Sequence, residues 1–218
     1  SITILDTIKS VNNQSYKNIE HIFIDGLSRD NTLDVIKNNS IRSSVIISEK
    51  DNGLYDALNK GVNLATGDFI GFLHSDDVFA CSNTISKIVD KLMSNSFDGV
   101  YGNLDYVSFS QTDKIIRHWQ SQYFKLDLLK NGWMPAHPTL FLSKDVYNKH
   151  GFFNVNYKIA ADYDFMIRVL KDSTLNFGFI DRVITKMRVG GASNKSLKNI
   201  IKKSREDLKI IKDHSIGI

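Results

Sequence analysis

Acidic residues stand directly after three short apolar runs in the first half of this 218-residue chain. They are Asp25, Asp51 and the adjacent pair Asp76 and Asp77. Neighbouring carboxylates repel each other, and a divalent cation such as Mg²⁺ or Mn²⁺ relieves that repulsion while bridging to substrate phosphates. Asp76 and Asp77 therefore indicate a metal site for a phosphate-containing ligand. In a second interpretation, Asp76 caps the next helix and Asp77 is solvated.

The elements that carry these acids alternate along the chain. Three apolar runs are predicted strands: His21–Asp25, Ser44–Ser48 and Asp68–Leu73. Segments with helical spacing of apolar residues precede the first run and separate the others. This alternation is typical of a parallel sheet covered by helices on both faces. Ligands bind such sheets at the carboxyl ends of the strands, which is where the acids lie.

The second half of the chain, from about Gly99, is less regular. We predict a small subsheet and a helix before the C-terminal helix. The predicted strands are Val100–Phe109, Lys114–Trp119, Met134–Leu142 and Asn176–Ile180, and the helix is Asp162–Leu170. The predicted organisation is one continuous domain, with a ligand-binding half at 1–98, a second half at 99–194 and a basic amphipathic helix at 195–218.

Charge and cysteine content exclude several classes of protein. The net charge is +4, and residues 195–214 alone hold seven basic and three acidic residues, which is the whole excess. A nucleic-acid surface spread over the fold is therefore not expected. The single cysteine, Cys81, excludes an intramolecular disulfide framework and a cysteine-clustered metal site. With no apolar run near 20 residues and no signal peptide, we expect a soluble, cytoplasmic protein.

Several segments resemble family-2 glycosyltransferases with the GT-A fold. The runs Phe23–Thr32 and Asp51–Asp77 are similar to that family's nucleotide-binding segments. Met134–Pro138 and Lys158–Arg168 resemble its acceptor-side segments, and Val183–Ser193 resembles its closing loop. The segments occur in the family's order over nearly the whole chain. The resemblance implies an α/β fold with a mostly parallel sheet flanked by helices, a small acceptor-side subsheet, and the activity of a bacterial polysaccharide glycosyltransferase.

The resemblance also implies which residues hold the sugar donor. Asp25 would contact the nucleobase, and Asp51 and Lys60 would line the donor pocket. Asp76 and Asp77 would bind the donor diphosphate through Mn²⁺ or Mg²⁺. The first acid of the family's Asp-X-Asp motif is replaced here by His74. This leaves open which of the two acids is the main metal ligand.

Asp162 is the candidate general base. The family has a Glu-Asp pair at this place, and Ala161-Asp162 keeps only the second acid. A carboxylate here would take the acceptor hydroxyl proton, and a single base implies one-step inversion at the anomeric carbon. In the alternative interpretation, Asp162 only caps its helix. His137, between two prolines, and Arg188, in the closing loop, are candidate contacts to the acceptor or to a phosphate.

Two further function classes remain open. The chain starts on a predicted helix, and its first residues align just after the Tyr-Asn that ends the family's first strand. A chain without that central strand could be a non-catalytic nucleotide-sugar binding fragment. Acids after parallel strands also occur in Mg²⁺-dependent phosphotransfer enzymes, although the strand that carries their nucleophilic aspartate has no counterpart in this sequence.

The C-terminal segment allows two interpretations. From Ser196 to Lys212 apolar residues recur at helical spacing and leave lysines on the opposite side. The helix either packs on the domain with a solvated basic face or rests on anionic lipid. The second interpretation would place the protein peripherally at the inner face of the membrane, beside a glycan or lipid-linked acceptor.

Overall fold

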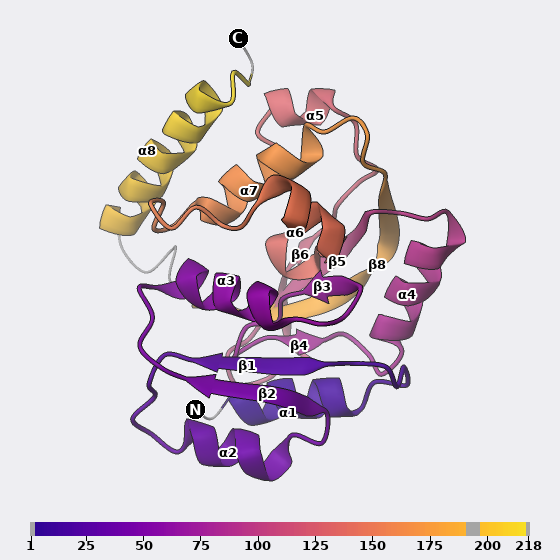
Figure 1. Cartoon of the computed structure of the whole chain (residues 1–218), viewed down its shortest axis with the longest axis vertical. Helices are drawn as coiled ribbons and strands as arrows, with labels where there is room; N and C mark the ends of the chain where they lie inside the picture. Colours follow the sequence, from indigo (N-terminus) through magenta and orange to yellow (C-terminus); the bar gives the residue numbers. More distant parts are fainter. Residues whose placement is uncertain (1–2, 191–196, 217–218) are drawn as a thin grey trace.

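The first half of the chain forms a two-stranded parallel sheet between helices (Figure 1). The computed structural model describes residues 3–190 and 197–216. The elements of this half are α1 Ile4–Asn12, β1 His21–Asp25, α2 Thr32–Asn39, β2 Ser43–Ser48 and α3 Leu54–Leu64. In the register of β1 and β2, Phe23 lies opposite Ile46 and Asp25 opposite Ser48. Both strands were predicted from the sequence.

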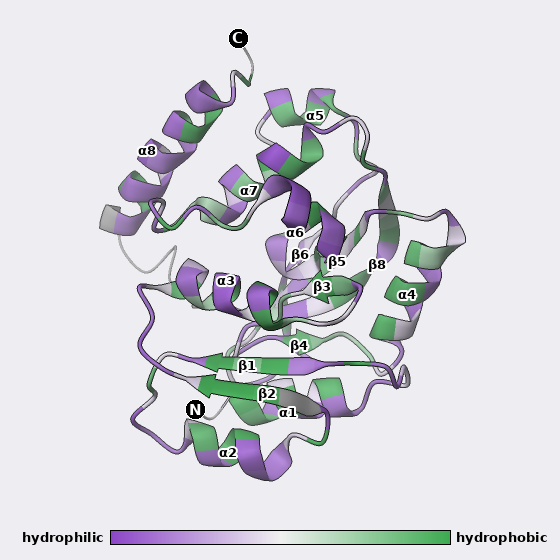
Figure 2. Cartoon of the chain, in the orientation of Figure 1, coloured by the Kyte–Doolittle hydropathy of each residue, from purple (hydrophilic) through white to green (hydrophobic). Residues whose placement is uncertain are grey.

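Helices cover both faces of this strand pair because side chains alternate along a strand. Phe23 joins a cluster with Ile8 of α1 and Ile36 of α2, so these helices cover one face. Ile22 packs on the other side, against the cluster that contains Val62 of α3. Figure 2 shows β1 and β2 as mainly hydrophobic and the outer surfaces of the helices as hydrophilic. The pair is therefore buried on both faces, as its apolar sequence predicted.

The remaining strands form a six-stranded mixed sheet. Its strand order is β3-β7-β5-β8-β4, with β6 paired to β5. The strands are β3 Phe69–Gly71, β4 Val78–Phe79, β5 Gly99–Val107, β6 Ile115–Trp119, β7 Phe141–Ser143 and β8 Phe177–Arg188. Only the β5–β8 pairing is parallel. The α/β class with helices on both faces is confirmed, but the sheet contains more antiparallel pairing than we predicted, because β4 and β7 enter it from loops instead of helical crossovers.

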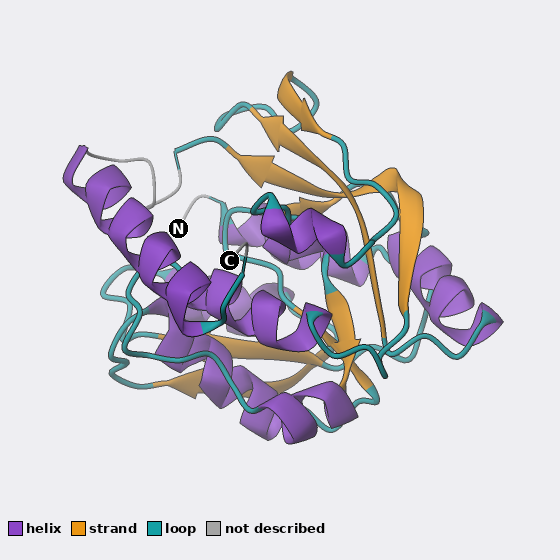
Figure 3. Ribbon diagram, turned by 90° about the horizontal axis from the view of Figure 1, so that it is seen from above, coloured by secondary structure: helices purple, strands orange, loops and turns teal. Residues whose placement is uncertain are grey.

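Helices also cover both faces of the larger sheet (Figure 3). They are α4 Thr84–Ser94, α5 Asp127–Lys130, α6 Lys144–His150 and α7 Ala161–Leu170. Ile88 of α4 packs with Val100 and Ile184 on one face. Phe165 of α7 joins the cluster of Tyr101 on the other face. The larger sheet is therefore packed between helices on both of its faces.

In the second half, one predicted strand was wrong and another was too short. Met134–Leu142 was expected to be a strand, but it contains a 3₁₀ turn at His137–Thr139 and only the start of β7. Pro135 and Pro138 cannot donate to a sheet ladder, which explains the break. The strand expected at Asn176–Ile180 is the beginning of the longer β8, which pairs with β5 as far as Arg188. The last three residues of the segment Val183–Ser193 lie outside the described residues.

The C-terminal helix α8, Leu197–Asp213, packs on α7 (Figure 1). Ile210 is fully buried in this contact. The helix predicted for the basic segment is present, although its first residues, 195 and 196, lie outside the described part. No helix among the described residues is long and apolar enough to cross a bilayer. No described strand joins β1 to the six-stranded sheet.

Candidate functional site

The loops after β1 and β2 meet at Asp25 and Asp51. Asp25 is 7% exposed, and its Oδ2 accepts hydrogen bonds from the Ser28 amide at 3.0 Å and the Ser48 hydroxyl at 2.7 Å. Burial raises the pKa of Asp25, but these hydrogen bonds outweigh it and hold the pKa below its ordinary value. Asp25 is therefore an ionised, fixed acceptor at the ends of two strands.

Asp51 lies against the loop that follows Asp25. A Cβ atom at Gly26 would collide with the Asp51 carboxylate, so only glycine allows this approach. The other oxygen of Asp51 accepts the amide of Gly53 at 2.9 Å. The structure thus brings together two of the residues predicted to bind the donor.

Lys60 has local ion-pair partners. Its ammonium lies 2.8 Å from Glu49 Oε1 and donates to the Lys50 carbonyl at 3.0 Å. The hydrogen bond from Lys60 to Glu49 is the main cause that raises the pKa of Lys60. Lys60 lines a shallow cleft of about 290 Å³ between β2 and α3. Because this cleft contains neither Asp25 nor Asp51, the structure does not gather Lys60 with those two acids there.

The loop between β3 and β4 separates the environments of Asp76 and Asp77. Asp76 is partly exposed, and its backbone carbonyl accepts a hydrogen bond from Arg188 Nη1 at 2.7 Å. Asp77 is fully buried, and its backbone carbonyl accepts the Thr7 hydroxyl of α1 at 2.7 Å. The two adjacent acids therefore present different groups: Asp76 a carboxylate near solvent, and Asp77 a carboxyl inside the fold.

Among the described residues, the charge of Arg188 lowers the pKa of the Asp77 carboxyl but does not outweigh the effect of burial. Neither oxygen of this carboxyl has a hydrogen-bond partner among those residues. Burial, followed by the charge of Asp76, raises the pKa of Asp77 to about 8. A buried carboxylate without a partner is costly, so this position favours either a proton or a nearby cation.

Arg188 is committed to contacts within the fold. The side chain is 3% exposed, and its three guanidinium nitrogens each form a hydrogen bond. Nε donates to the Phe109 carbonyl at 2.8 Å, Nη1 to Asp76, and Nη2 to Asp6 Oδ2 at 2.5 Å. In this arrangement Arg188 fixes the backbone at Asp76. The three bonds use three of the five guanidinium N–H donors, and burial of the side chain limits the access of a phosphate to the other two.

Asp162 lies at the start of α7 beside Tyr55 of α3. The Tyr55 hydroxyl donates to Asp162 Oδ1 at 2.9 Å and lies 2.6 Å from the Ile159 carbonyl. Burial raises the pKa of Asp162, and the Tyr55 hydrogen bond opposes that rise. The described residues donate no hydrogen bond to Oδ2, so this oxygen is the one that an acceptor hydroxyl can use.

Two histidines lie between the acids. Burial lowers the pKa of His74 to about 4; His137 lowers it further, and the charges of Asp76 and Asp162 raise it. The His74 and His137 rings are 6.1 Å apart. Neither nitrogen of His137 has a partner among the described residues, and burial lowers its pKa to about 4. Both imidazoles are therefore neutral groups that can accept or donate one hydrogen bond per nitrogen.

These charge effects indicate that Asp76 and the candidate base Asp162 are both within electrostatic range of His74. The charges of Asp76 and Asp162 both raise the pKa of His74, although 86 positions separate the two acids in the sequence. Tyr55 follows Asp51 and also holds Asp162, so it links the donor-side loop to the base. Sequence reasoning did not single out Tyr55. The only sequence signal is its place in the Asp51–Asp77 run.

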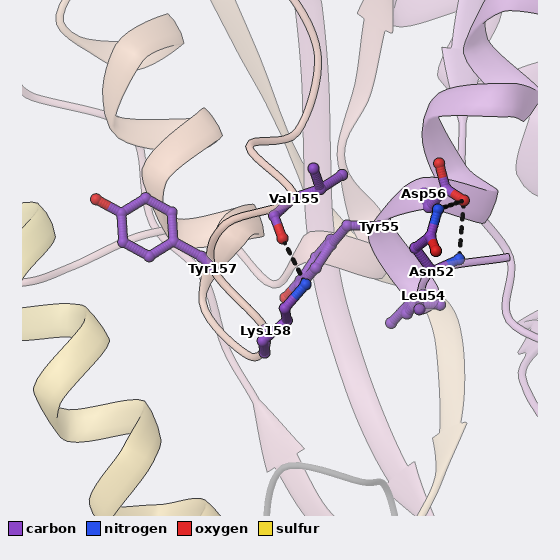
Figure 4. Close-up of a pocket in the computed structure, with 8 residues that line it drawn as sticks. Asn52, Leu54, Tyr55, Asp56, Val155, Tyr157 and Lys158 are labelled. Carbon is purple, nitrogen blue, oxygen red and sulfur yellow. Dashed lines mark hydrogen bonds between the residues drawn. The ribbon is translucent and has the colours of Figure 1, made fainter.

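A small cleft lies beside Tyr55 (Figure 4). It opens between the start of α3 and the loop before α7, and Tyr55, Asp56, Tyr157 and Lys158 belong to its lining. Lys158 folds back in this loop and donates to the Val155 carbonyl at 2.9 Å. The cleft volume is about 20 Å³, which is room for a single water molecule. This cleft therefore has no room for a sugar.

Asp76 and Asp77 are the candidate ligands for a divalent cation. No group of three or more His, Cys, Asp or Glu side chains gathers among the described residues. Mg²⁺ and Mn²⁺ are commonly held by one or two carboxylates together with substrate phosphates and water. Asp76, which is partly exposed, and Asp77, which lacks partners, fit that minimal set. The residues present thus fit a cation that arrives with its phosphate ligand.

Comparisons with known proteins agree with this geometry. A family model described as "Glycosyl transferase family 2" matches residues 2–152. The Escherichia coli protein "UDP-Glc:alpha-D-GlcNAc-diphosphoundecaprenol beta-1,3-glucosyltransferase WfgD" is 31% identical over 183 residues, which cover 82% of this chain and 70% of that protein.

Two solved structures share the fold. Staphylococcus aureus TarS 1-349 in complex with UDP-GlcNAc has a TM-score of 0.77 at 15% identity and covers 100% of this chain. Mannosyltransferase PcManGT from Pyrobaculum calidifontis, in complex with GDP-Man and Mn²⁺, has a TM-score of 0.66 at 13% identity and covers 97%. This chain spans 63% and 60% of those two chains. The match over most of the sequence and the shared fold lead to one conclusion: the chain belongs to glycosyltransferase family 2.

Proposed function

We propose that this protein transfers a sugar from a nucleoside-diphosphate donor to a hydroxyl acceptor with inversion at the anomeric carbon. The observation that supports the proposal is that the charges of Asp76 and Asp162 both raise the pKa of His74, so both acids are within electrostatic range of the same histidine. A group suited to the donor diphosphate and a carboxylate suited to an acceptor hydroxyl then flank one site. Family membership supports the same reaction class.

In this proposal the donor binds across the ends of β1 and β2. Asp25, ionised and fixed by two hydrogen bonds, accepts hydrogen bonds from the nucleobase. Asp51 lies next to the same loop and contacts the nucleoside. Lys60 is a weaker candidate for donor binding, because Glu49 and the Lys50 carbonyl already hold its ammonium.

Asp76 is our proposed main ligand for Mn²⁺ or Mg²⁺, with Asp77 behind it. The partial exposure of Asp76 supports this order, because Asp77 is fully buried. The cation, when bound, would neutralise the negative charge of the leaving diphosphate. Arg188 supports the site by holding the Asp76 carbonyl.

Asp162 acts as the general base for the acceptor. Its free Oδ2 takes the proton of the acceptor hydroxyl while that oxygen forms a bond to the anomeric carbon. The bond from the anomeric carbon to the diphosphate oxygen breaks, and the nucleoside diphosphate leaves with the electron pair. One carboxylate suffices for this displacement, which inverts the configuration. His137, with two unpartnered nitrogens, is our candidate contact to the acceptor.

Substitution of the base tests this function. With a panel of UDP- and GDP-sugars, Asp162→Asn is expected to slow nucleotide release by roughly 10²–10⁴-fold, the usual cost of losing a general base. Donor affinity should stay within error, because the base contacts the acceptor. Asp145→Asn, which changes an exposed aspartate at the start of α6, is the matched control. Turnover of Asp162→Asn at the parent rate would refute the assignment.

We also propose that the acceptor is lipid-linked and that α8 faces the membrane. The exposed residues of α8 include Lys202, Arg205, Lys209 and Lys212. Ile201 and Leu208 are 55% and 60% exposed on the same helix. Its acids have inward or local partners: Glu206 bonds to the loop before α7, and Asp207 pairs with Lys203 at 2.6 Å. A face of basic and apolar side chains suits an anionic lipid surface.

A further inference from the structure

The loop that leads into α7 is held by a residue far along the chain. Glu206 of α8 accepts hydrogen bonds from three successive backbone amides. Its Oε2 lies 3.1, 2.9 and 3.0 Å from the amide nitrogens of Lys158, Ile159 and Ala160. Oε1 also accepts from Lys158, at 3.0 Å. One carboxylate therefore fixes the backbone that immediately precedes Asp162.

The amides that Glu206 binds lie just before the first turn of α7. The N-cap residue of α7 is Ala160, whose side chain cannot accept a hydrogen bond. Asp162 lies within the first turn, where its Oδ1 accepts the Tyr55 hydroxyl and the Tyr163 amide, the latter at 3.0 Å. Glu206 therefore holds the segment that leads into the helix, and Asp162 binds an amide of the first turn itself. A carboxylate at this position also matches the positive end of the helix dipole.

The same segment anchors Tyr55. The Tyr55 hydroxyl lies 2.6 Å from the carbonyl of Ile159, whose amide is bound by Glu206. That hydroxyl is also 2.9 Å from Asp162 Oδ1. The Tyr55 hydroxyl, which has one proton, thus lies within hydrogen-bond distance of both the segment that Glu206 holds and Asp162. Movement of the loop would alter both the place of Asp162 and its hydrogen bond.

We propose that Glu206 is a positioning residue for the general base, so that α8 contributes to the active site without touching substrate. The inference rests on the proposed role of Asp162. Helix α8 has other attachments to the domain. Asp213 accepts the Tyr157 hydroxyl at 3.2 Å, His214 lies 2.8 Å from Asp164, and Ile210 is fully buried. Loss of Glu206 therefore leaves α8 docked while it releases the loop.

The test compares Glu206→Ala and Glu206→Gln with Asp213→Asn in the full chain. Glu206→Ala is expected to lower kcat about 10- to 100-fold, since small displacements of a reacting group have effects of that size. The donor Kd should not change. Glu206→Gln keeps the side-chain length and one acceptor oxygen, so its loss of kcat should be smaller. Asp213→Asn removes a carboxylate of the same helix that does not contact residues 158–160, and it should behave like the parent.

Two further readouts separate positioning from a purely structural cap. Hydrogen exchange of the amides of residues 158–160 should accelerate in Glu206→Ala. The acid limb of the kcat–pH profile should move to higher pH, because a released loop weakens the Tyr55 hydrogen bond that lowers the pKa of Asp162. A structural cap would change the exchange but not the profile.

The outcomes are distinct. Faster exchange with parent kcat and an unmoved acid limb in Glu206→Ala would overturn the inference and leave Glu206 as a cap. If Glu206→Ala does not fold, the same three measurements on Glu206→Gln decide: parent kcat with faster exchange overturns the inference, and reduced kcat with a moved limb supports it. Parent turnover by Asp162→Asn would instead refute the proposed function.

Discussion

At the scale of single residues, the site depends on how two carboxyls are compensated. Asp162 is half-buried and accepts a hydroxyl hydrogen bond, whereas Asp77 is fully buried and its carboxyl oxygens have no hydrogen-bond partner among the described residues. The hydrogen bond limits the rise in the pKa of Asp162, so this carboxyl can be an ionised base. Burial and hydrogen bonding thus affect the two carboxyls differently, and a substitution can test each of them.

Removal of the Tyr55 hydroxyl should shift the pH dependence of transfer. The hydrogen bond from Tyr55 lowers the pKa of Asp162, so Tyr55→Phe raises that pKa. The base must be ionised, and activity is therefore lost at a higher pH as the solution is acidified. We expect the acid limb of the kcat–pH profile to move upward. Tyr157→Phe, which loses only the bond to Asp213, is the control, and a limb that stays in place would contradict the role of Tyr55.

The two acids of the metal motif should respond differently to substitution. The sequence predicts that Asp76→Asn and Asp77→Asn each weaken Mn²⁺-dependent nucleotide binding. The partial exposure of Asp76 leads us to expect the larger loss there, about tenfold or more, in calorimetric titrations with UDP and GDP. Unchanged Mn²⁺-dependent affinity in both variants would remove the metal assignment.

Asp77→Asn should also stabilise the cation-free protein at alkaline pH. The folded-state pKa of Asp77 is about 8, above its ordinary value of 3.8, so ionisation disfavours the folded state increasingly as pH rises through that interval. A neutral amide avoids this cost. At pH 9 we expect the free energy of unfolding to rise by about 2 kcal/mol or more in urea denaturation. An unchanged or lower value would show that the carboxylate has a compensating partner.

Sequence reasoning found the site residues that lie at the ends of predicted strands. Asp25, Asp51 and Asp76 follow apolar runs, and strand ends of an α/β sheet gather at one edge. The roles of Tyr55, which bonds to Asp162, and of Glu206, which bonds to the segment before it, were not found, because both depend on tertiary packing. The segment that contains Glu206 is rich in basic residues, so its net charge was noticed and the contacts of its acids were not.

At the scale of elements, periodicity predicted the first half of the chain better than the second. β1 and β2 are buried on both faces, so their sequences are continuously apolar and easily recognised. β7 is three residues long and follows a proline-containing turn. Such a short strand forms because it pairs with β3 and β5, and three residues are too few to show the periodicity that predicts a strand.

Helix α8 gives a prediction that concerns its outer face. Replacement of Lys202, Arg205, Lys209 and Lys212 by Gln should abolish cosedimentation with anionic vesicles at low salt. Each basic residue near such a surface contributes about 1 kcal/mol, and the binding of the parent should fall as salt rises. The control replaces four exposed lysines elsewhere, Lys9, Lys17, Lys37 and Lys125, and so changes the net charge equally. Parent-like binding of the α8 variant, or no binding by the parent, would contradict the membrane proposal.

At the scale of the whole molecule, we propose that three parts of the chain form one site. The loops after β1 and β2 supply Asp25 and Asp51, the β3–β4 loop supplies Asp76, and α7 supplies Asp162. Tyr55 connects the first part to α7, and Arg188 of β8 connects the second part to the sheet. If the protein were a binding module without catalysis, Asp162 would not act as a base. That alternative predicts nucleotide binding without sugar transfer.

The anomeric configuration of the transferred sugar tests the central claim most directly. The donor in the panel that supports the fastest nucleotide release is incubated with the protein and an α-GlcNAc-diphospholipid analogue, and the new linkage is read by ¹H NMR. With Asp162 as the single base, the account predicts a configuration opposite to that of the donor. A product that retains the donor configuration would contradict it.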